Sequence, residues 1–194
     1  GDWFMDDEVG HDPKLDEVRE KIQRMLTEDP SRKIVIFSMY SDTAQYIYKA
    51  LLSSGLSRTF FYYGGSSSAD KQTISANFDA SYPVERQEND YDIIVATDAL
   101  SEGFNLHRAG IIINYDIPYN PTRVVQRIGR INRINRKVFD QIYIYNCFPT
   151  AIGDEVVNVR GIATLKMLLI NTIVGSDTKT LTDDEDLRSY FKRQ

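Results

Sequence analysis

The sequence predicts an α/β fold in which a mainly parallel sheet is covered by helices on both faces. Two observations predict it. Short apolar runs typical of buried strands, of which residues 92–97 form the clearest, recur along the chain. Between them lie segments whose apolar residues recur at helical spacing. Binding sites in such folds lie at the carboxyl ends of the strands, so the loops that follow the apolar runs are the informative ones.

The first half of the chain is expected to contain three helices and two strands. Asp12 and Pro13 resemble an N-cap and a first helical turn, and apolar residues then recur at helical spacing from Leu15 to Leu26. A strand is expected at 33–38. After a polar turn, a second helix runs through Ala44 and Leu51 and ends at Gly55. The remaining expectations are a strand at 59–63, a loop at 64–65 and a helix at 69–78.

The second half continues the alternation. After a surface loop at 80–90, strands are expected at 92–97, 110–115 and 139–146, with a helix at 121–133 that begins at a proline. Residues 12–150 are interpreted as one domain. Residues 1–11 are interpreted as a linker or tail, and residues 151–194 as a helical extension, with its helix at 155–174, followed by a charged tail.

Composition excludes several classes of function. The formal net charge of -5 and the pI near 5.1 make bulk attraction to nucleic acid or anionic membranes unexpected, so a phosphate partner needs a local basic patch. The single cysteine, Cys147, excludes an internal disulfide framework, and His11 and His107 lack zinc spacing, so no metal site is expected. No apolar stretch could span a membrane, which favours a soluble cytoplasmic protein. The chain begins without methionine, which suggests a piece of a longer protein.

A local basic patch does exist, in the stretch QRIGRINRINR at residues 126–136. Arginine stands at every third position from Arg127 to Arg136, interleaved with branched apolar residues. We expect one side of this helix to be buried and the guanidinium groups to project from a fixed scaffold. Each guanidinium is a rigid fork of donors that matches phosphate oxygens. The alternative interpretation is a solvated basic helix face.

Two stretches of unusual composition carry a resemblance to a known family. ATDALSEGFNL at residues 96–106 resembles motif V of the superfamily 2 helicases, and QRIGRINR at 126–133 resembles motif VI. VIFSMYSDTAQYIYKAL at 35–51 resembles motif IV, and the order and spacing match across residues 33–147. The basic block and the later LLINTIVGSDTKTLTDDED are most similar to bacterial helicases of the SWI/SNF-like branch.

The resemblance implies a second RecA-like domain, a three-layer sandwich, from a two-domain motor that binds ATP between its lobes. Arg130 and Arg133 match the motif VI arginines that face the triphosphate, where arginine fingers stabilise charge on the transferred phosphoryl group. Gln126 matches the first position of that motif and Arg127 the second, near the nucleotide.

The resemblance also implies contacts from the strand-end loops. Gly103 and Asn105 match motif V positions near the nucleotide, although many relatives have Asp where Asn105 stands. Thr97 matches a position near a backbone phosphate. Ser38 and the pair Gly64 and Gly65 are further candidates for nucleic-acid contact, with a plain turn as the alternative role of each. Tyr40, Tyr62 and Tyr63 could stack on bases, but the resembled family mainly contacts the backbone, and strand tyrosines are interpreted mainly as core.

The sequence contains no Gly-x-x-x-x-Gly-Lys-Ser/Thr loop and no acidic pair after an apolar strand, so ATP and Mg²⁺ would be held mainly by an absent first lobe. We therefore expect the parent protein to hydrolyse ATP and this chain alone to be inactive. The resemblance favours double-stranded DNA as the partner. The alternatives are a non-catalytic nucleic-acid or protein binding module, and a Rossmann-type nucleotide enzyme, which lacks support because no Gly-x-Gly-x-x-Gly opens a helix.

Overall fold

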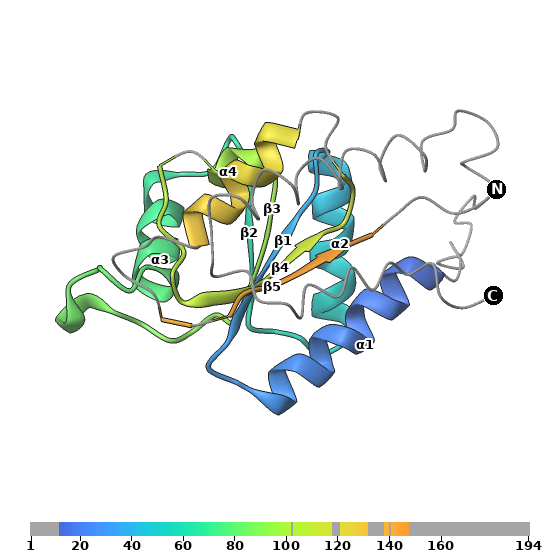
Figure 1. The fold of residues 1–194 in the computed structure, drawn as a ribbon, viewed down its shortest axis with the longest axis horizontal. Coiled ribbons are helices and arrows are strands. Elements are labelled where there is room, and N and C mark those ends of the chain that lie inside the picture. The colour runs from blue at the N-terminus through green and yellow to red at the C-terminus, as the bar shows by residue number, and fades with distance from the viewer. Residues whose placement is uncertain (1–11, 102, 118–120, 132–137, 140, 148–194) are drawn as a thin grey trace, which may run out of the picture.

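The structure is a computed structural model that describes residues 12–101, 103–117, 121–131, 138–139 and 141–147. The described part forms a five-stranded, all-parallel sheet with helices on both faces, as expected (Figure 1). The helical extension and charged tail expected at 151–194 lie outside the described residues, as does the linker at 1–11. The helices are α1 (Pro13–Glu28), α2 (Ser41–Ser53), α3 (Ser68–Phe78) and α4 (Pro121–Ile131), and the strands are β1 (Lys33–Phe37), β2 (Thr59–Tyr62), β3 (Ile93–Ala96), β4 (Ala109–Asn114) and β5 (Tyr143–Asn146).

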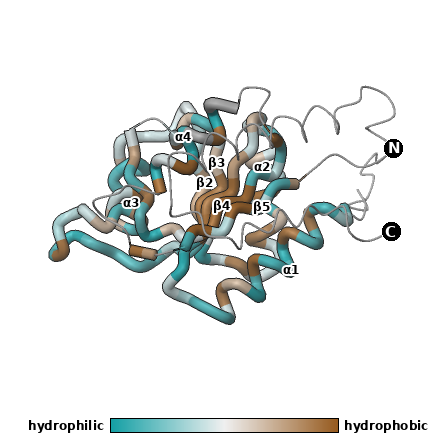
Figure 2. Tube along the Cα trace, viewed as in Figure 1, coloured by the Kyte–Doolittle hydropathy of each residue, from teal (hydrophilic) through white to brown (hydrophobic). Residues whose placement is uncertain are grey.

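The strand order is β2-β3-β1-β4-β5. The central strands β1, β3 and β4 are buried along their whole length, which explains why they appear in the sequence as continuous apolar runs. Figure 2 shows this apolar centre with more hydrophilic helices around it. The expected strands therefore agree with the structure to within one or two residues, except for the last one.

The last strand was expected at 139–146 but begins at Tyr143. The register gives the reason. Tyr143 pairs with Ile111, and just before this pair the Arg32 side chain contacts both segments, its Nη1 donating to the carbonyl oxygens of Gly110 at 3.4 Å and Gln141 at 2.5 Å. A strand needs a partner for its backbone hydrogen bonds, and apolar alternation alone does not provide one.

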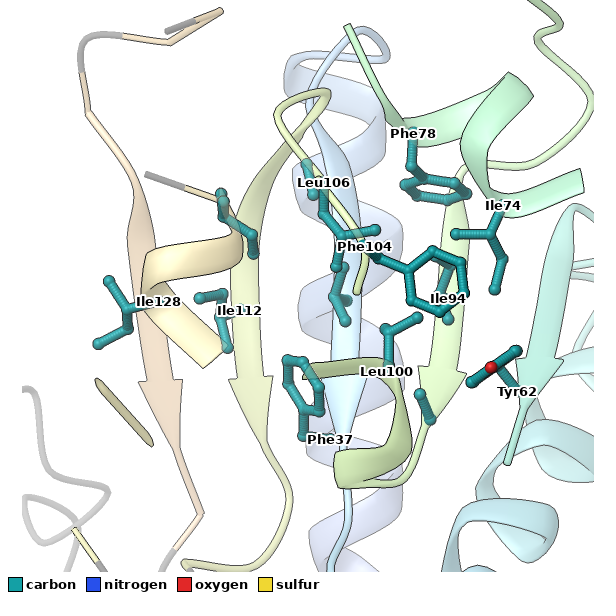
Figure 3. Close-up of a cluster of buried hydrophobic side chains, with 14 of the residues drawn as sticks. Phe37, Tyr62, Ile74, Phe78, Ile94, Leu100, Phe104, Leu106, Ile112 and Ile128 are labelled. Atoms are coloured by element: carbon teal, nitrogen blue, oxygen red, sulfur yellow. The ribbon is translucent and has the colours of Figure 1, made fainter. Parts of the chain in front are cut away.

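Successive residues of a strand point to opposite sides of the sheet, so each face packs against its own set of helices. On one face, Ile34 and Ile36 of β1 pack with apolar residues of α1 and α2. On the other face, Val35 and Phe37 pack with α3, α4 and the loop that contains Leu100 and Phe104 (Figure 3). Each helix is thus fixed to a rigid sheet by its apolar stripe.

Local sequence sets where the helices begin. Asp12 caps α1 by accepting a hydrogen bond from the Leu15 amide at 3.2 Å, with Pro13 in the first turn as expected. Helix α3 begins with a capping box, in which Ser67 and Asp70 satisfy each other's backbone amides. Both caps end a loop at a defined residue.

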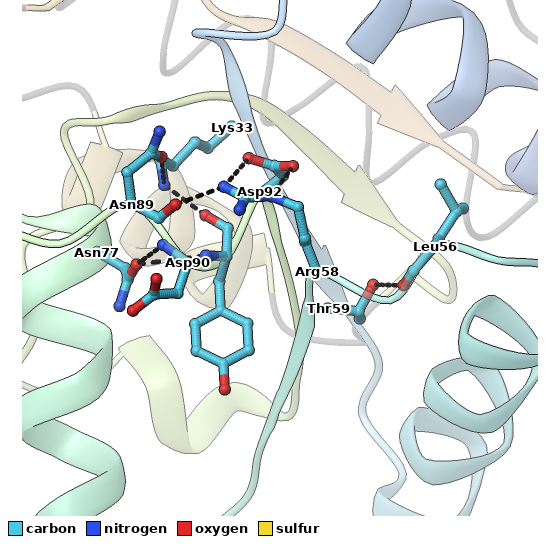
Figure 4. A network of polar contacts seen from close by, with 9 residues as sticks. Lys33, Leu56, Arg58, Thr59, Asn77, Asn89, Asp90 and Asp92 are labelled. Atoms are coloured by element: carbon cyan, nitrogen blue, oxygen red, sulfur yellow. Dashed lines mark hydrogen bonds and ion pairs between the residues drawn. The ribbon is translucent and has the colours of Figure 1, made fainter.

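A polar network closes the amino-terminal edge of the sheet (Figure 4). Lys33, only 2% exposed, donates from Nζ to Asn89 Oδ1 at 2.9 Å and to the Tyr91 carbonyl oxygen. Arg58 pairs with Asp92 through two hydrogen bonds of 2.7 and 3.2 Å. Burial lowers the pKa of Lys33 to about 8. This edge faces away from the strand ends that carry the candidate site.

Candidate functional site

The carboxyl ends of the five strands bring the predicted site residues to one edge of the sheet. Backbone hydrogen bonds continue the pairing into the loops: Ser38 N donates to Ala96 O at 3.0 Å, and Thr97 N donates to Tyr62 O at 3.3 Å. The loops after β1, β2 and β3 therefore start side by side. Among the predicted residues, Ser38, Gly64, Gly65 and Thr97 all lie here.

Ser38 is buried and hydrogen-bonded within the protein. Its Oγ donates to Asp116 Oδ2 at 2.5 Å and accepts from the Tyr40 amide at 3.2 Å, while the Met39 amide donates to Asp116 Oδ1 at 2.7 Å. These contacts join the end of β1 to the loop that follows β4 and hold the loop that leads into α2. Asp116 was not predicted. Its position directly after an apolar strand is the signal that could have identified it.

The loop after β3 begins with a short 3₁₀ turn, η2 (Asp98–Ser101), which was not predicted. Gly103 follows at φ +88°, a left-handed conformation that L side chains rarely adopt, and a Cβ there would meet no atom within 4 Å. The glycine is therefore required by backbone conformation alone. Gly103 is exposed and Asn105 is half-buried, so both lie at the surface of this loop.

Helix α4 packs directly against this loop. Val124, Ile128 and Ile131 are buried against the sheet, while Gln126 is exposed. The Leu106 amide donates to the carbonyl oxygen of Arg130 at 2.9 Å, which joins the end of the loop to the last turn of the helix. The segments that resemble motifs V and VI thus form one packed unit.

Arg127 departs from the expectation that the arginines project from the helix. It is fully buried because it lies three residues after Val124 and four before Ile131, on the apolar stripe of the helix. Its Nε donates to Asp98 Oδ1 at 2.6 Å and its Nη1 to Asn114 Oδ1 at 2.8 Å. The guanidinium carbon also lies 4.7 Å from the centre of the Phe37 ring.

These contacts extend through the protein on both sides of Arg127. Asn114 donates from Nδ2 to Asn146 Oδ1 at 2.8 Å, so the chain of contacts reaches β5. Asp98 also pairs with the exposed Arg123, whose Nη1 lies 3.2 Å from Asp98 Oδ2. Arg127 therefore links α4, the η2 turn and two strands. Asp98 and Asn114 were not predicted, because in sequence each is one polar residue at a strand end.

Arg130 is placed differently. It is half-buried, and its Nε donates to the carbonyl oxygen of Ser101 at 2.6 Å. Among the described residues, no carboxylate pairs with it and neither terminal nitrogen has a hydrogen-bond partner. A guanidinium anchored through Nε keeps its two terminal nitrogens for a carboxylate or a phosphate. Arg133, the second predicted finger, lies outside the described residues.

The described residues contain no group of three His, Cys, Asp or Glu side chains that could hold a metal ion. A membrane span is also missing from this part of the chain, where no helix is both long and apolar enough.

Comparison with known proteins places this arrangement in a family. The family model described as "Helicase conserved C-terminal domain" matches residues 17–135, more than half of the chain. The chain belongs to this helicase family. The matched range begins within α1 and contains the first four strands and the whole motif VI segment.

Curated relatives agree. The chain is 34% identical over 150 residues to the uncharacterized ATP-dependent helicase YqhH of Bacillus subtilis, a match that covers 77% of this chain and 24% of that protein. It is 27% identical over 118 residues to the DEAD-box ATP-dependent RNA helicase RhpA of Helicobacter pylori, covering 61% of this chain and 22% of the relative. It is 26% identical over 133 residues to the RNA polymerase-associated protein RapA of Vibrio cholerae, covering 69% of this chain and 13% of the relative. The chain thus spans a quarter or less of these relatives.

Solved structures confirm the RecA-like fold. The C-terminal part of the Fun30 ATPase domain matches with a TM-score of 0.62 at 18% identity, covering 89% of this chain and 57% of that one. Dbp5 of S. cerevisiae, solved with RNA and ADP BeF3, matches with a TM-score of 0.60 at 19% identity, covering 84% of this chain and 36% of that one. The predicted resemblance to the C-terminal domain of a superfamily 2 helicase is confirmed.

Proposed function

We propose that this chain is the second motor lobe of an ATP-dependent helicase or translocase, which supplies arginine fingers to ATP bound by a first lobe. The observation that carries the proposal is the placement of Arg130. Helix α4 is fixed to the sheet, Nε is anchored on Ser101 O at 2.6 Å, and the terminal fork has no described partner. An anchored fork is preorganised for a phosphate that another lobe presents.

The nucleotide would be ATP with Mg²⁺, held mainly by the first lobe, and it supplies the phosphoryl group that is transferred to water. Arg130, together with Arg133, stabilises the negative charge that develops on that group. Gly103, Asn105 and Gln126 lie at the surface around the same loop and helix, where they can contact the nucleotide. Arg127 is buried beneath them, and its part in this site is to hold α4 in place.

The same edge of the sheet would hold the nucleic-acid backbone. Thr97, half-buried, and the exposed pair Gly64 and Gly65 follow adjacent strands, and buried Ser38 shapes the loop beside them. Hydroxyl groups and free backbone amides are common phosphate contacts. We propose double-stranded DNA as the track, because the basic block is most similar to the SWI/SNF-like branch.

The mechanism follows from the packing of the two segments. Closure of the lobes around ATP brings Arg130 to the γ-phosphate, and the loop after β3 moves with α4 because Leu106 and Ser101 are bonded to Arg130. Hydrolysis removes the phosphate that holds the lobes together and the cleft reopens. Repeated closure and reopening of the lobes moves the contacts that one lobe makes with the nucleic-acid backbone relative to those of the other lobe.

Replacement of Arg130 by alanine in the complete protein tests this proposal. Nucleic-acid-stimulated ATP turnover should fall about a thousandfold, since a finger acts mainly on the transition state. Nucleotide affinity, measured by binding of a fluorescent ATP analogue, should change much less. Arg130→Lys should not restore turnover, because an ammonium group lacks the fork.

Arg86→Ala is the matched control. Arg86 is an exposed arginine in the 3₁₀ turn η1 (Val84–Arg86), outside the strand-end loops of the site. Its replacement should leave turnover unchanged. Turnover of Arg130→Ala near that of wild type would show that Arg130 is not a finger.

A further inference from the structure

Tyr63 is an exposed aromatic residue at the edge of the sheet that we assign to nucleic acid. It directly follows β2, and 43% of it is exposed, whereas its neighbour Tyr62 is 5% exposed and packs in the core. The expectation that both tyrosines are core residues therefore holds only for Tyr62. The exposed ring of Tyr63 lies directly beside the predicted binding loop at Gly64 and Gly65.

The ring of Tyr63 is supported from below. It stacks on Phe61 with centroids 5.4 Å apart and planes at 20°, and Phe61 stacks in the same way on Tyr48 of α2, again at 5.4 Å and 20°. No other described ring or cation stacks on Tyr63. The three rings form a ladder that starts on a helix and ends at the surface.

The backbone at Tyr63 is fixed as well. Its amide donates to Ser66 Oγ at 3.1 Å, and its carbonyl oxygen accepts from the Ser66 amide at 3.0 Å. The turn closes just before the capping box that begins α3. A ring whose stacking partner and backbone are both fixed loses little conformational entropy when a ligand packs on it.

Of the two glycines of this turn, Gly65 lies against the Tyr63 ring and Gly64 does not. A Cβ on Gly65 would lie 2.6 Å from Tyr63 Cε2, so the ring occupies the space that a side chain would take. Gly64 and Gly65 are exposed, and neither has a positive φ, so backbone conformation does not require glycine here. Close approach to the Tyr63 ring requires it at Gly65, whereas a Cβ on Gly64 would meet only Ala99 Cβ at 4.0 Å.

We propose that Tyr63 packs its ring against the apolar face of a deoxyribose in duplex DNA. The phosphate next to that sugar then lies beside the turn formed by Gly64 and Gly65. This inference rests on the proposed function, which places a nucleic-acid backbone at this edge. In a duplex the bases are paired and stacked, so a ring beside the backbone meets the sugar. In a single strand the same ring could instead stack on an unpaired base.

The test compares Tyr63→Leu and Tyr63→Phe in the complete protein by fluorescence anisotropy with labelled duplex DNA. Leucine keeps apolar bulk without a flat ring, and phenylalanine keeps the ring. Tyr63→Leu should bind about fivefold more weakly, the lower end of the range for loss of an aromatic contact, and Tyr63→Phe should bind as wild type. Tyr143→Leu is the control, since Tyr143 is 39% exposed but begins β5 at the opposite edge.

Salt dependence gives a second readout. A lost phosphate contact lowers the slope of log affinity against log salt, whereas a lost apolar contact leaves that slope unchanged. The slope of Tyr63→Leu should therefore equal that of wild type. A reduced slope would overturn the apolar contact and assign the effect to the phosphate backbone.

Binding to single-stranded DNA and to an abasic sugar-phosphate strand distinguishes a contact with the sugar from a contact with an unpaired base. A loss for Tyr63→Leu on duplex and abasic strands supports the sugar contact. A loss confined to the strand that carries unpaired bases would overturn it in favour of base stacking, and equal binding by wild type and Tyr63→Leu on every strand would overturn both. If wild type binds none of the strands, the proposed function itself fails.

Discussion

Arg127 shows how one residue can have a different role from its neighbours in the same repeat. Its guanidinium is buried and bonded to Asp98 and Asn114, while Nη2 has no hydrogen-bond partner among the described residues. A buried charge is tolerated only when it is paired. The pair with Asp98 is therefore what permits an arginine on the apolar side of α4.

Asp98→Ala should lower the free energy of unfolding by about 3 kcal/mol, because it leaves the buried guanidinium without its carboxylate. The double variant Asp98→Ala with Arg127→Met should be more stable than Asp98→Ala alone, since methionine removes the charge and fills similar space. Urea unfolding of the single and double variants measures both differences. Additive losses would show that the two residues do not depend on each other.

Lys33 gives a prediction about pH. Burial lowers its pKa in the folded protein to about 8 from 10.5, so between these values the unfolded chain binds more protons than the folded one. The free energy of unfolding then rises with pH in that window, by about 1.4 kcal/mol for each unit by which the pKa is lowered.

Lys33→Met isolates this effect, because the variant cannot titrate at this position. The difference in unfolding free energy, wild type minus Lys33→Met, should increase between about pH 8 and pH 10.5 and be constant below pH 8. Urea unfolding at a series of pH values measures it. A difference that stays constant across the window would contradict a lowered pKa.

At the scale of elements, two glycines in the candidate site have open space around them but opposite backbone requirements. Gly103 has φ +88°, whereas Gly129 lies within α4, and a Cβ at either position would meet no atom within 4 Å. Sterics with neighbours therefore cannot distinguish them. Backbone conformation can.

Gly103→Ala should destabilise the protein by about 1 kcal/mol, because alanine is strained in the left-handed region. Gly129→Ala should stabilise it by about 0.5–1 kcal/mol, because alanine is the better helix former. Thermal unfolding of the two variants beside wild type tests the pair. Shifts of the same sign would mean that the loop or the helix has a different backbone from the one described.

The elements were largely predictable from sequence, and their side-chain contacts were not. The runs that became β1, β3 and β4 are apolar throughout because both faces of the sheet are covered, and period and length identify them. The role of Arg130 stays a prediction from its motif. The burial of Arg127 was not predictable, because a buried arginine depends on a carboxylate 29 residues away, Asp98, that only the fold brings near.

The same limit applies to Ser38 and Tyr63. The bonds of Ser38 to Asp116 join residues 78 positions apart, and parallel strand pairing creates that contact. Tyr62 and Tyr63 look alike in sequence, but one faces the core and the other ends the strand at the surface. Periodicity predicts which side of a strand a residue takes and does not predict where the neighbouring loops leave it open.

At the scale of the whole molecule, the described chain is a rigid platform. Both faces of the sheet are packed by helices, and the candidate site lies along one edge of it. The terminal nitrogens of Arg130, the left-handed turn at Gly103 and the loops that we propose to contact nucleic acid share this edge. In the proposed function this edge forms half of an ATP site, and the other half lies on the first lobe.

The measurement that tests this account most directly is ATP turnover by the complete protein alone and with duplex DNA, single-stranded DNA or RNA, beside the 194-residue chain by itself. We predict that duplex DNA stimulates turnover by the complete protein and that the isolated chain is inactive. Turnover by the isolated chain would contradict a shared site. No turnover by the complete protein under any condition would contradict the motor and indicate a non-catalytic binding module.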